Sequence, residues 1–160
     1  MSCHQLHRRD FLYQSLLTGT CALGAGRLAA KEQQLPVFGQ GKFRYRPVAG
    51  WGVLDERTPV KNCSAMVVDA RGRIYLLTDH CANNVIVYDK DGKLLQKWGT
   101  RFPGAHGLEI VQEEGREVLF ITDLNLHRVF KTTLDGEILM ELAYPKSTGK
   151  YANEKEYRPA

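Results

Sequence analysis

The sequence has little excess of charge of either sign, which argues against one large class of partner. It contains 22 lysines and arginines against 18 aspartates and glutamates, a formal net charge of +4 at pH 7. Nucleic-acid-binding domains carry a clustered basic face, whereas the lysines and arginines here alternate with acidic residues along the chain. We therefore expect no nucleic-acid partner.

The sequence also has no apolar run long enough to span a membrane comfortably. Its most apolar stretch, residues 16–26, is short and rich in glycine. Arg8 and Arg9 precede this stretch and small residues follow it up to Ala30, which is the layout of an export signal. The arginine pair resembles a twin-arginine signal. We expect residues 1–30 to form this signal as a helix and the protein to be periplasmic or extracellular; the alternative is an N-terminal core helix, which the glycines would weaken.

Cysteine is scarce, and two of the four cysteines, Cys3 and Cys21, lie in the expected signal. If residues 70–72 form a tight turn between two paired strands, the numbers of two residues that face each other sum to about 142. Cys63 then lies opposite roughly residue 79, which is close to Cys81. A disulfide is then geometrically feasible and an exported protein would permit it. The alternative is a pair of unpaired small hydrophobic residues. These two cysteines alone do not make a zinc site, because the second pair of ligands is missing.

No segment after residue 30 is long enough, or helically periodic enough, to connect parallel strands. The chain instead contains an internal repeat, which runs without a gap and indicates a repeat architecture. Corresponding residues are separated by 44 positions: Thr78-Asp79 and Thr122-Asp123, Val85 and Val129, Asp91-Gly92 and Asp135-Gly136, Leu95 and Leu139.

Each copy of the repeat contains four expected strands, rich in β-branched and aromatic residues. The two Asp-Gly pairs mark hairpin turns, because glycine accepts the positive φ that such turns need. A further strand is expected at 42–48, where apolar and basic residues alternate. The repeat strands are expected at roughly 64–69, 73–78, 84–89 and 94–98, and at roughly 107–111, 117–122, 128–133 and 137–142.

Four-stranded units at this spacing are typical of β-propeller blades, and a single β-sandwich is the alternative. We predict an all-β fold, an incomplete β-propeller with two four-stranded NHL-type blades plus an N-terminal strand, preceded by the signal helix. The expected segments are the signal (1–30), a linker with the N-terminal strand (31–61), blade 1 (62–100), blade 2 (101–143) and a loop into a missing blade (144–160).

Two parts of the repeat resemble known families. Residues 72–99 resemble an NHL repeat. They contain, in order, Gly-Arg-Ile-Tyr, Thr-Asp, Asn-Asn-Val-Ile-Val-Tyr-Asp-Lys-Asp-Gly-Lys and Trp-Gly. Two segments of the second copy are similar to a blade of the peptidyl-α-hydroxyglycine α-amidating lyases. They are Phe-Pro-Gly-Ala-His-Gly-Leu (102–108) and Ile-Thr-Asp-Leu-Asn-Leu-His-Arg-Val-Phe-Lys (121–131). Those enzymes are six-bladed propellers that release glyoxylate from a hydroxylated C-terminal glycine and leave a peptide amide. The resemblance covers about residues 42–142.

The resemblance implies a zinc ligand at His106 and calcium-binding backbone carbonyls at Leu108 and Met66. It implies zinc and calcium as cofactors. Asp79 stands about where the family has a substrate-handling arginine, so an acid there would have the opposite electrostatic effect. From its place in the chain rather than from the resemblance, His127 is a second candidate for the substrate pocket; the alternative is a residue at a strand start that packs or forms a hydrogen bond. No catalytic residue is assigned, because the catalytic tyrosine, the other zinc histidines and the calcium-binding aspartate would follow the end of this sequence.

The residues themselves leave simpler roles open. His106 has small neighbours that leave its imidazole uncrowded, but one histidine is not a zinc site, and a hydrogen-bonded loop histidine is the alternative. Asp79 and Asp123 each follow a threonine, which favours hydrogen bonds to backbone donors of the turn over acid–base chemistry. Ser64 takes the place of His106 in the first copy and has no visible base, so it is not a nucleophile.

We predict an exported, lyase-like NHL-repeat protein whose enzymatic status stays open. Two blades do not close a ring of six, so the sequence predicts a fragment or an early-terminated copy without full activity. Its open blade edges would favour self-association. The competing prediction is a non-enzymatic module whose loops hold a peptide or another small ligand at the propeller channel. A product without function is the third.

Overall fold

The computed structural model describes residues 36–160, and within this range the protein is all-β, with ten strands, two 3-10 helices and no α-helix. The predicted export signal lies outside the described residues. None of the helices between residues 36 and 160 is long and apolar enough to span a membrane. The chain divides into two compact units, 1–48 and 49–160.

The described part of the first unit is a two-stranded hairpin of β1 (Phe38–Gln40) and β2 (Phe43–Tyr45). The sequence predicted a strand at 42–48 and assigned the residues of β1 to a linker. The difference arises because Gly41 takes a left-handed φ of 56°, which closes a tight turn and lets the two segments pair.

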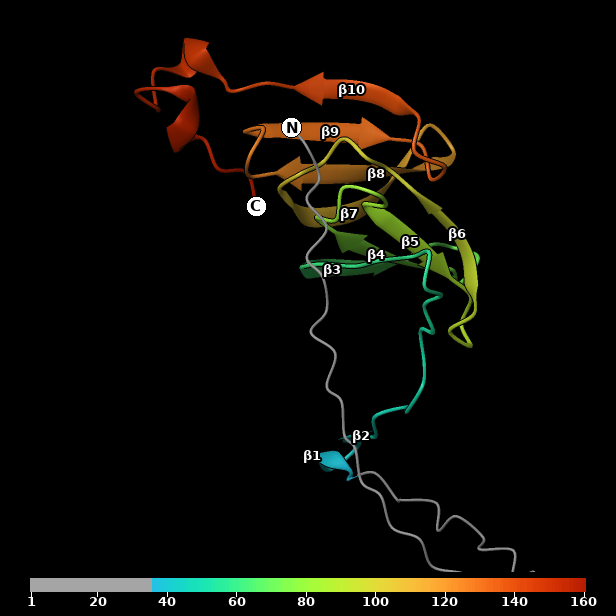
Figure 1. Ribbon diagram of the computed structural model, residues 1–160. Helices are drawn as coiled ribbons and strands as arrows, with labels where there is room; N and C mark the ends of the chain where they lie inside the picture. The colour runs from blue at the N-terminus through green and yellow to red at the C-terminus, as the bar shows by residue number, and fades with distance from the viewer. Residues whose placement is uncertain (1–35) are drawn as a thin grey trace, which may run out of the picture. The chain divides into compact units, whose positions relative to one another are not determined.

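The second unit contains two four-stranded antiparallel sheets, in which each strand pairs with the next along the chain (Figure 1). Sheet 1 consists of β3 (Cys63–Val68), β4 (Ile74–Thr78), β5 (Val85–Tyr88) and β6 (Leu94–Trp98). Sheet 2 consists of β7 (Ala105–Glu113), β8 (Arg116–Asp123), β9 (Arg128–Thr132) and β10 (Ile138–Leu142).

These eight strands confirm the predicted repeat strands to within two residues at each end. The pairing of Val68 with Ile74 and of Met66 with Leu76 has the predicted sum of 142. The turn between β7 and β8 is shorter than the sequence suggested. Glu114 and the glycine after it both have left-handed φ angles, 48° and 79°, and this pair closes a two-residue hairpin.

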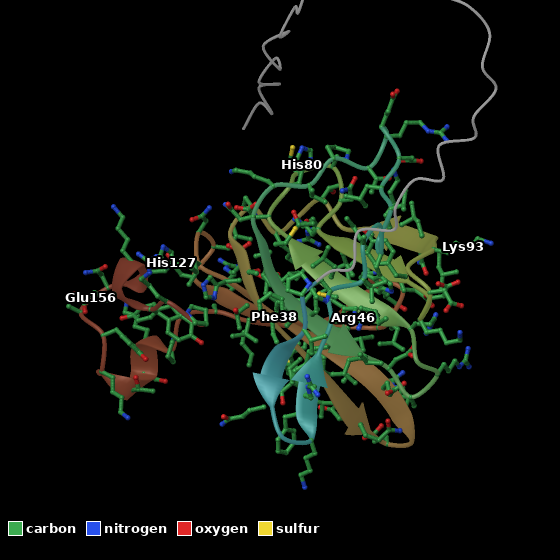
Figure 2. The ribbon with its side chains drawn as sticks, turned by 90° about the horizontal axis from the view of Figure 1, so that it is seen from below. Phe38, Arg46, His80, Lys93, His127 and Glu156 are labelled. Atoms are coloured by element: carbon green, nitrogen blue, oxygen red, sulfur yellow. The ribbon has the colours of Figure 1, made fainter. Side chains whose placement is uncertain are left out.

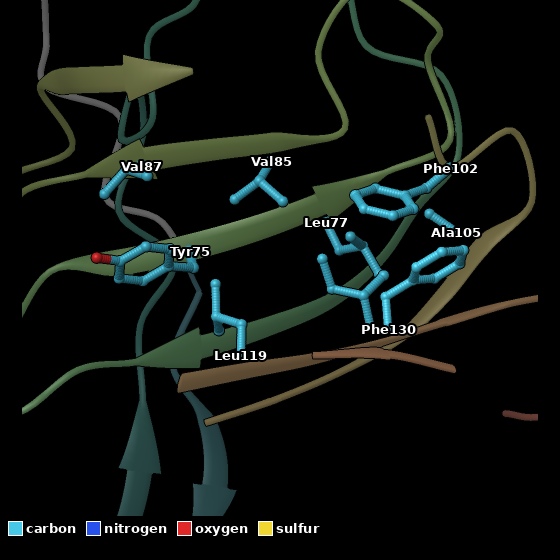
Figure 3. Packing of buried hydrophobic residues seen from close by; sticks show 9 residues of the cluster. Tyr75, Leu77, Val85, Val87, Phe102, Ala105, Leu119 and Phe130 are labelled. Carbon is cyan, nitrogen blue, oxygen red and sulfur yellow. The ribbon is translucent and has the colours of Figure 1, made fainter. Parts of the chain in front are cut away.

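An apolar core lies between the two sheets (Figure 3). Sheet 1 contributes side chains from its two central strands, and the corresponding strands of sheet 2 supply the opposing side. The rings of Phe102 and Phe130 are tilted against each other with centroids 4.9 Å apart, a favourable aromatic geometry. The buried members are Tyr75, Leu77, Val85, Val87, Phe102, Ala105, Leu119, Ile121 and Phe130, each at most 5% exposed.

The two sheets meet through faces that are not equivalent in the repeat. Asp89 and Thr133 hold the same place in their hairpins, since each N–H donates to the carbonyl four residues later, at 3.0 and 2.9 Å. Val87 lies two residues before Asp89, and Lys131 lies two residues before Thr133, so Val87 and Lys131 are equivalent. Val87 belongs to the core between the sheets, whereas in sheet 2 the core residue is Phe130 and not Lys131. Because alternate residues of a strand face opposite sides, sheet 2 packs with the opposite face, in a head-to-tail arrangement. The face of each sheet that contributes to this core is its inner face, and the other is its outer face.

The predicted correspondence of residues 44 positions apart, without a gap, is therefore wrong for one pair of strands. The pairing of β8 with β9 is shifted by one residue relative to the pairing of β4 with β5. In sheet 1, Leu77 pairs with Val85. The correspondence would pair Ile121 with Val129, whereas Ile121 pairs with Phe130. The connection between β8 and β9 is tighter than its counterpart in sheet 1, and this tighter connection accommodates the shift.

A tryptophan packs against the hairpin glycine in both copies. Trp98, at the end of sheet 1, lies over the turn of sheet 2, where a Cβ on Gly136 would be 2.5 Å from the indole. Trp51 lies over the turn of sheet 1, where a Cβ on Gly92 would be 3.0 Å from its ring. The indole N–H of Trp51 donates to the Lys90 carbonyl at 3.1 Å. Both contacts require glycine in the turn. Each of them links the last hairpin of a sheet to the segment that precedes that sheet in the sequence.

We predict that Gly136→Ala destabilises the second unit by about 2–4 kcal/mol, because the methyl group overlaps the Trp98 indole and φ is 93°. Gly72→Ala is the matched control. Gly72 has a φ of 78° but no atom within 4 Å of its Cβ position, so about 1 kcal/mol is expected. Urea unfolding of both variants checks this, and equal losses would contradict the packing.

Candidate functional site

Some of the residues singled out by the sequence, Asp79, His106 and Asp123, lie at the end of the sheets where β3 and β7 begin. His106 and Gly107 lie in a β-bulge of β7, between the pairs that Ala105 and Leu108 form with β8. His106 is exposed. Sheet 1 has a bulge at the same place, at Ser64. Bulges redirect side chains and are frequent beside functional sites, so both copies present a redirected residue at the start of their first strand.

Asp123 fixes the neighbouring loop. Its carboxylate is fully buried and accepts hydrogen bonds from the N–H groups of Gly104 at 2.9 Å and of Asn125 and Leu126 at 2.8 Å each. The prediction that this aspartate satisfies backbone donors is confirmed. The β8–β9 loop and the segment before β7 are therefore held together by one side chain.

In the first copy, and within residues 36–160, Asp79 binds only the segment before β3. It accepts from the backbone N–H of Asn62 at 2.9 Å and from its side-chain amide at 2.8 Å, and lies 3.8 Å from the Lys61 ammonium. They confirm that Asp79 accepts from a backbone donor, but this donor belongs to the segment before β3 and not to the turn. In the turn itself, the N–H of His80 donates to the Thr78 hydroxyl at 3.1 Å. Asp79 does not line the cavity that contains His127, so the structure does not bring these two candidates for the substrate pocket together.

His127 adopts an uncommon backbone conformation, with φ at 55°. Its Nδ1 lies 2.8 Å from the carbonyl oxygen of Tyr157. Because a carbonyl only accepts, we assign the proton to Nδ1, which leaves Nε2 for another partner. Figure 2 shows His127 beside the C-terminal segment that carries Glu156. Strained residues of this kind concentrate at functional sites.

The C-terminal segment is ordered by tyrosines. It contains the 3-10 helices η1 (Lys146–Thr148) and η2 (Glu154–Glu156). The Tyr151 ring lies edge-on to both Tyr144 and Tyr157, with centroids 6.4 and 5.4 Å away, and the Tyr144 hydroxyl donates to the Tyr151 carbonyl at 3.0 Å. This cluster places the Tyr157 carbonyl against His127.

A cavity of about 430 Å³ lies between this segment and the β8–β9 loop. The Arg128 guanidinium forms an ion pair with Glu141. Among the described residues, Arg101 has no ion-pair or hydrogen-bond partner, so it is available to a ligand. His127 was predicted for a pocket from the sequence, whereas neither arginine was. The lining residues are Arg101, Asn125, Leu126, His127, Arg128, Phe130, Glu141 and Glu154.

The residues implied for metal binding do not form a metal site between residues 36 and 160. No three histidine, cysteine, aspartate or glutamate side chains gather there. His106 is a single imidazole, whereas zinc needs three or four ligands. Met66, on β3, is 52% exposed, and Leu108, on β7, packs against the core. Zinc and calcium therefore stay predictions, and no chemistry is assigned to them.

Cys63 is a free, exposed thiol, so the disulfide considered between Cys63 and Cys81 is not formed. Cys63 pairs with Thr78 across the strands, and its sulfur lies 3.9 Å from the carbonyl oxygen of Lys61. The neighbouring strand residues desolvate part of the otherwise exposed thiol, and this desolvation, followed by the nearby Asp79 carboxylate, raises the pKa of Cys63. A raised pKa keeps the thiol protonated and unreactive.

No family model matches the chain, and no match is found among curated proteins or solved structures. The resemblance to NHL repeats and to the amidating lyases rests on the sequence motifs alone.

We predict that Asp123→Ala lowers the free energy of unfolding by about 3 kcal/mol, because three backbone donors lose their buried acceptor. Asp135→Ala, at an exposed turn of the same sheet, is the control and should change it by about 0.5 kcal/mol or less. Chemical denaturation monitored by circular dichroism measures both. A similar small effect of the two substitutions would show that Asp123 does not fix the loop.

Proposed function

We propose that this protein is an exported β-propeller module of the NHL type, related to the amidating lyases, that binds a peptide or another small ligand at the loop end of its sheets. The head-to-tail packing of the two four-stranded sheets supports the architecture. Propeller blades stack in this way around an axis, since each blade presents one face to the blade before it and the other to the blade after it.

The cavity beside His127 is the observation that carries the binding function. Its volume suits a small ligand or one end of a peptide. The unpaired Arg101 guanidinium provides a site for a carboxylate. The free Nε2 of His127 accepts a hydrogen bond from an N–H or O–H group of the ligand. The related enzymes act on peptides that end in a carboxylate, which fits this arrangement.

A lyase-type metal role is the second candidate, and the position of His106 favours it. The side chain is exposed on the bulge at the start of β7, and within residues 36–160 it has no hydrogen-bond or ion-pair partner. A free imidazole held on a rigid strand is a suitable metal ligand. The other ligands would have to come from residues outside those described.

We predict that a peptide ending in a free glycine carboxylate binds more tightly than its C-terminal amide, and that Arg101→Ala weakens its binding roughly tenfold through loss of the charged hydrogen bond. Arg116→Ala, at the opposite end of β8, is the matched control and leaves binding unchanged. Isothermal titration calorimetry provides the affinities. If neither peptide binds, the binding function is wrong; if both variants bind like the wild type, only the role of Arg101 is wrong.

The two candidate functions differ in their response to His106→Ala. If His106 binds metal, the purified protein contains Zn²⁺ and the variant loses it, as measured by elemental analysis. In a module that only binds ligands through the cavity, the zinc content is unaffected and peptide affinity is retained. We expect the second outcome, because His106 does not line the cavity.

A further inference from the structure

The core between sheet 1 and sheet 2 is an interface of a kind that can be repeated. An interface between equivalent faces closes on itself, whereas an interface between non-equivalent faces leaves one free face at each side for a further unit. The inner faces of the two sheets are non-equivalent, as Val87 and Phe130 show. The outer face of sheet 1 is therefore of the type that sheet 2 uses for packing against a different sheet, and the reverse holds for the outer face of sheet 2. The two outer faces are thus complementary in type, like the two inner faces.

The outer face of sheet 1 exposes large apolar side chains. Met66 and Val68, on β3, are 52% and 60% exposed. Their pairing partners, Leu76 and Ile74, are only partly buried. The segment before β3 covers a different part of this face, where the Trp51 ring lies against Tyr88 at the far end of β5.

The outer face of sheet 2 carries a second apolar area, on its edge strand β10. Leu142 is 47% exposed and pairs with Val129, which is partly buried. Met140 lies on the same face, opposite Lys131. The Lys131 ammonium is bound to Glu113 and lies 5.8 Å from the centre of the Phe120 ring, so its charge is already neutralised.

We propose that a second copy of this chain packs the outer face of its sheet 2 onto the outer face of sheet 1, which continues the head-to-tail stacking from one molecule to the next. The repeat indicates that the partner is a second copy of this chain, because sheet 2 already packs on sheet 1 through non-equivalent faces within one molecule. The apolar side chains on both outer faces provide the favourable burial. This contact is made by the faces of the sheets, whereas the sequence predicted association through open blade edges.

Sedimentation velocity of the full chain over a wide range of concentrations tests this association. We expect the wild type to form dimers and larger species as the concentration rises. Val68→Lys and Leu142→Lys each place a lysine in the contact and raise the dissociation constant roughly tenfold or more. Val53→Lys is the matched control, because Val53 is 68% exposed and lies outside both sheets. It should associate like the wild type.

Mixing the two face variants distinguishes head-to-tail association from other modes. Val68→Lys retains the outer face of sheet 2, and Leu142→Lys retains the outer face of sheet 1, so the mixture has one intact interface and forms a discrete dimer. The proposal is overturned if the wild type stays monomeric, if Val53→Lys impairs association equally, or if the mixture forms no dimer. None of these results bears on peptide binding, which has its own test.

Discussion

The packing of the inner face of sheet 2 on that of sheet 1 is the constraint on which the rest of the second unit depends. Neither sheet alone buries its apolar residues, because an isolated four-stranded meander leaves both faces in water, and one face becomes buried only when another layer packs on it. The cluster around Leu77, Ile121 and Phe130 removes these surfaces from solvent. Because the two faces are not equivalent in the repeat, this packing also sets the direction in which the sheets follow each other.

The candidate site follows from this packing. Phe102 enters the core directly before β7 and packs against Phe130, which brings the segment before β7 next to the β8–β9 loop. Asp123 then joins the two segments through backbone hydrogen bonds. The Tyr157 carbonyl holds the His127 ring from the other side. The cavity is thus bordered by elements that the core and one buried carboxylate position, which suits a preorganised binding site.

Much of the fold could be predicted from the sequence, because strand periodicity and the Asp-Gly turns are local signals. The two-residue length of the turn at Glu114 and the strand β1 were missed, since a left-handed glutamate and a short exposed strand leave little trace in sequence. The choice of inner face could not be predicted, because apolar residues occupy both faces of the strands, as Val129 and Phe130 show. The role of Asp123 was predictable from the Thr-Asp motif. The cavity was not, because Arg101 and Glu141, which are distant in the sequence, come to line the same cavity only through tertiary packing.

The central claim is that the two sheets are copies of one unit packed head-to-tail. Nuclear Overhauser effects between assigned side chains in solution test it most directly, because they identify which face of β9 meets sheet 1. The account predicts cross-peaks from the Phe130 ring to methyl groups of the inner face of sheet 1, and none from the Val129 methyls to that face. Cross-peaks from Val129 to Leu77 or Val85, with none from Phe130, would contradict it.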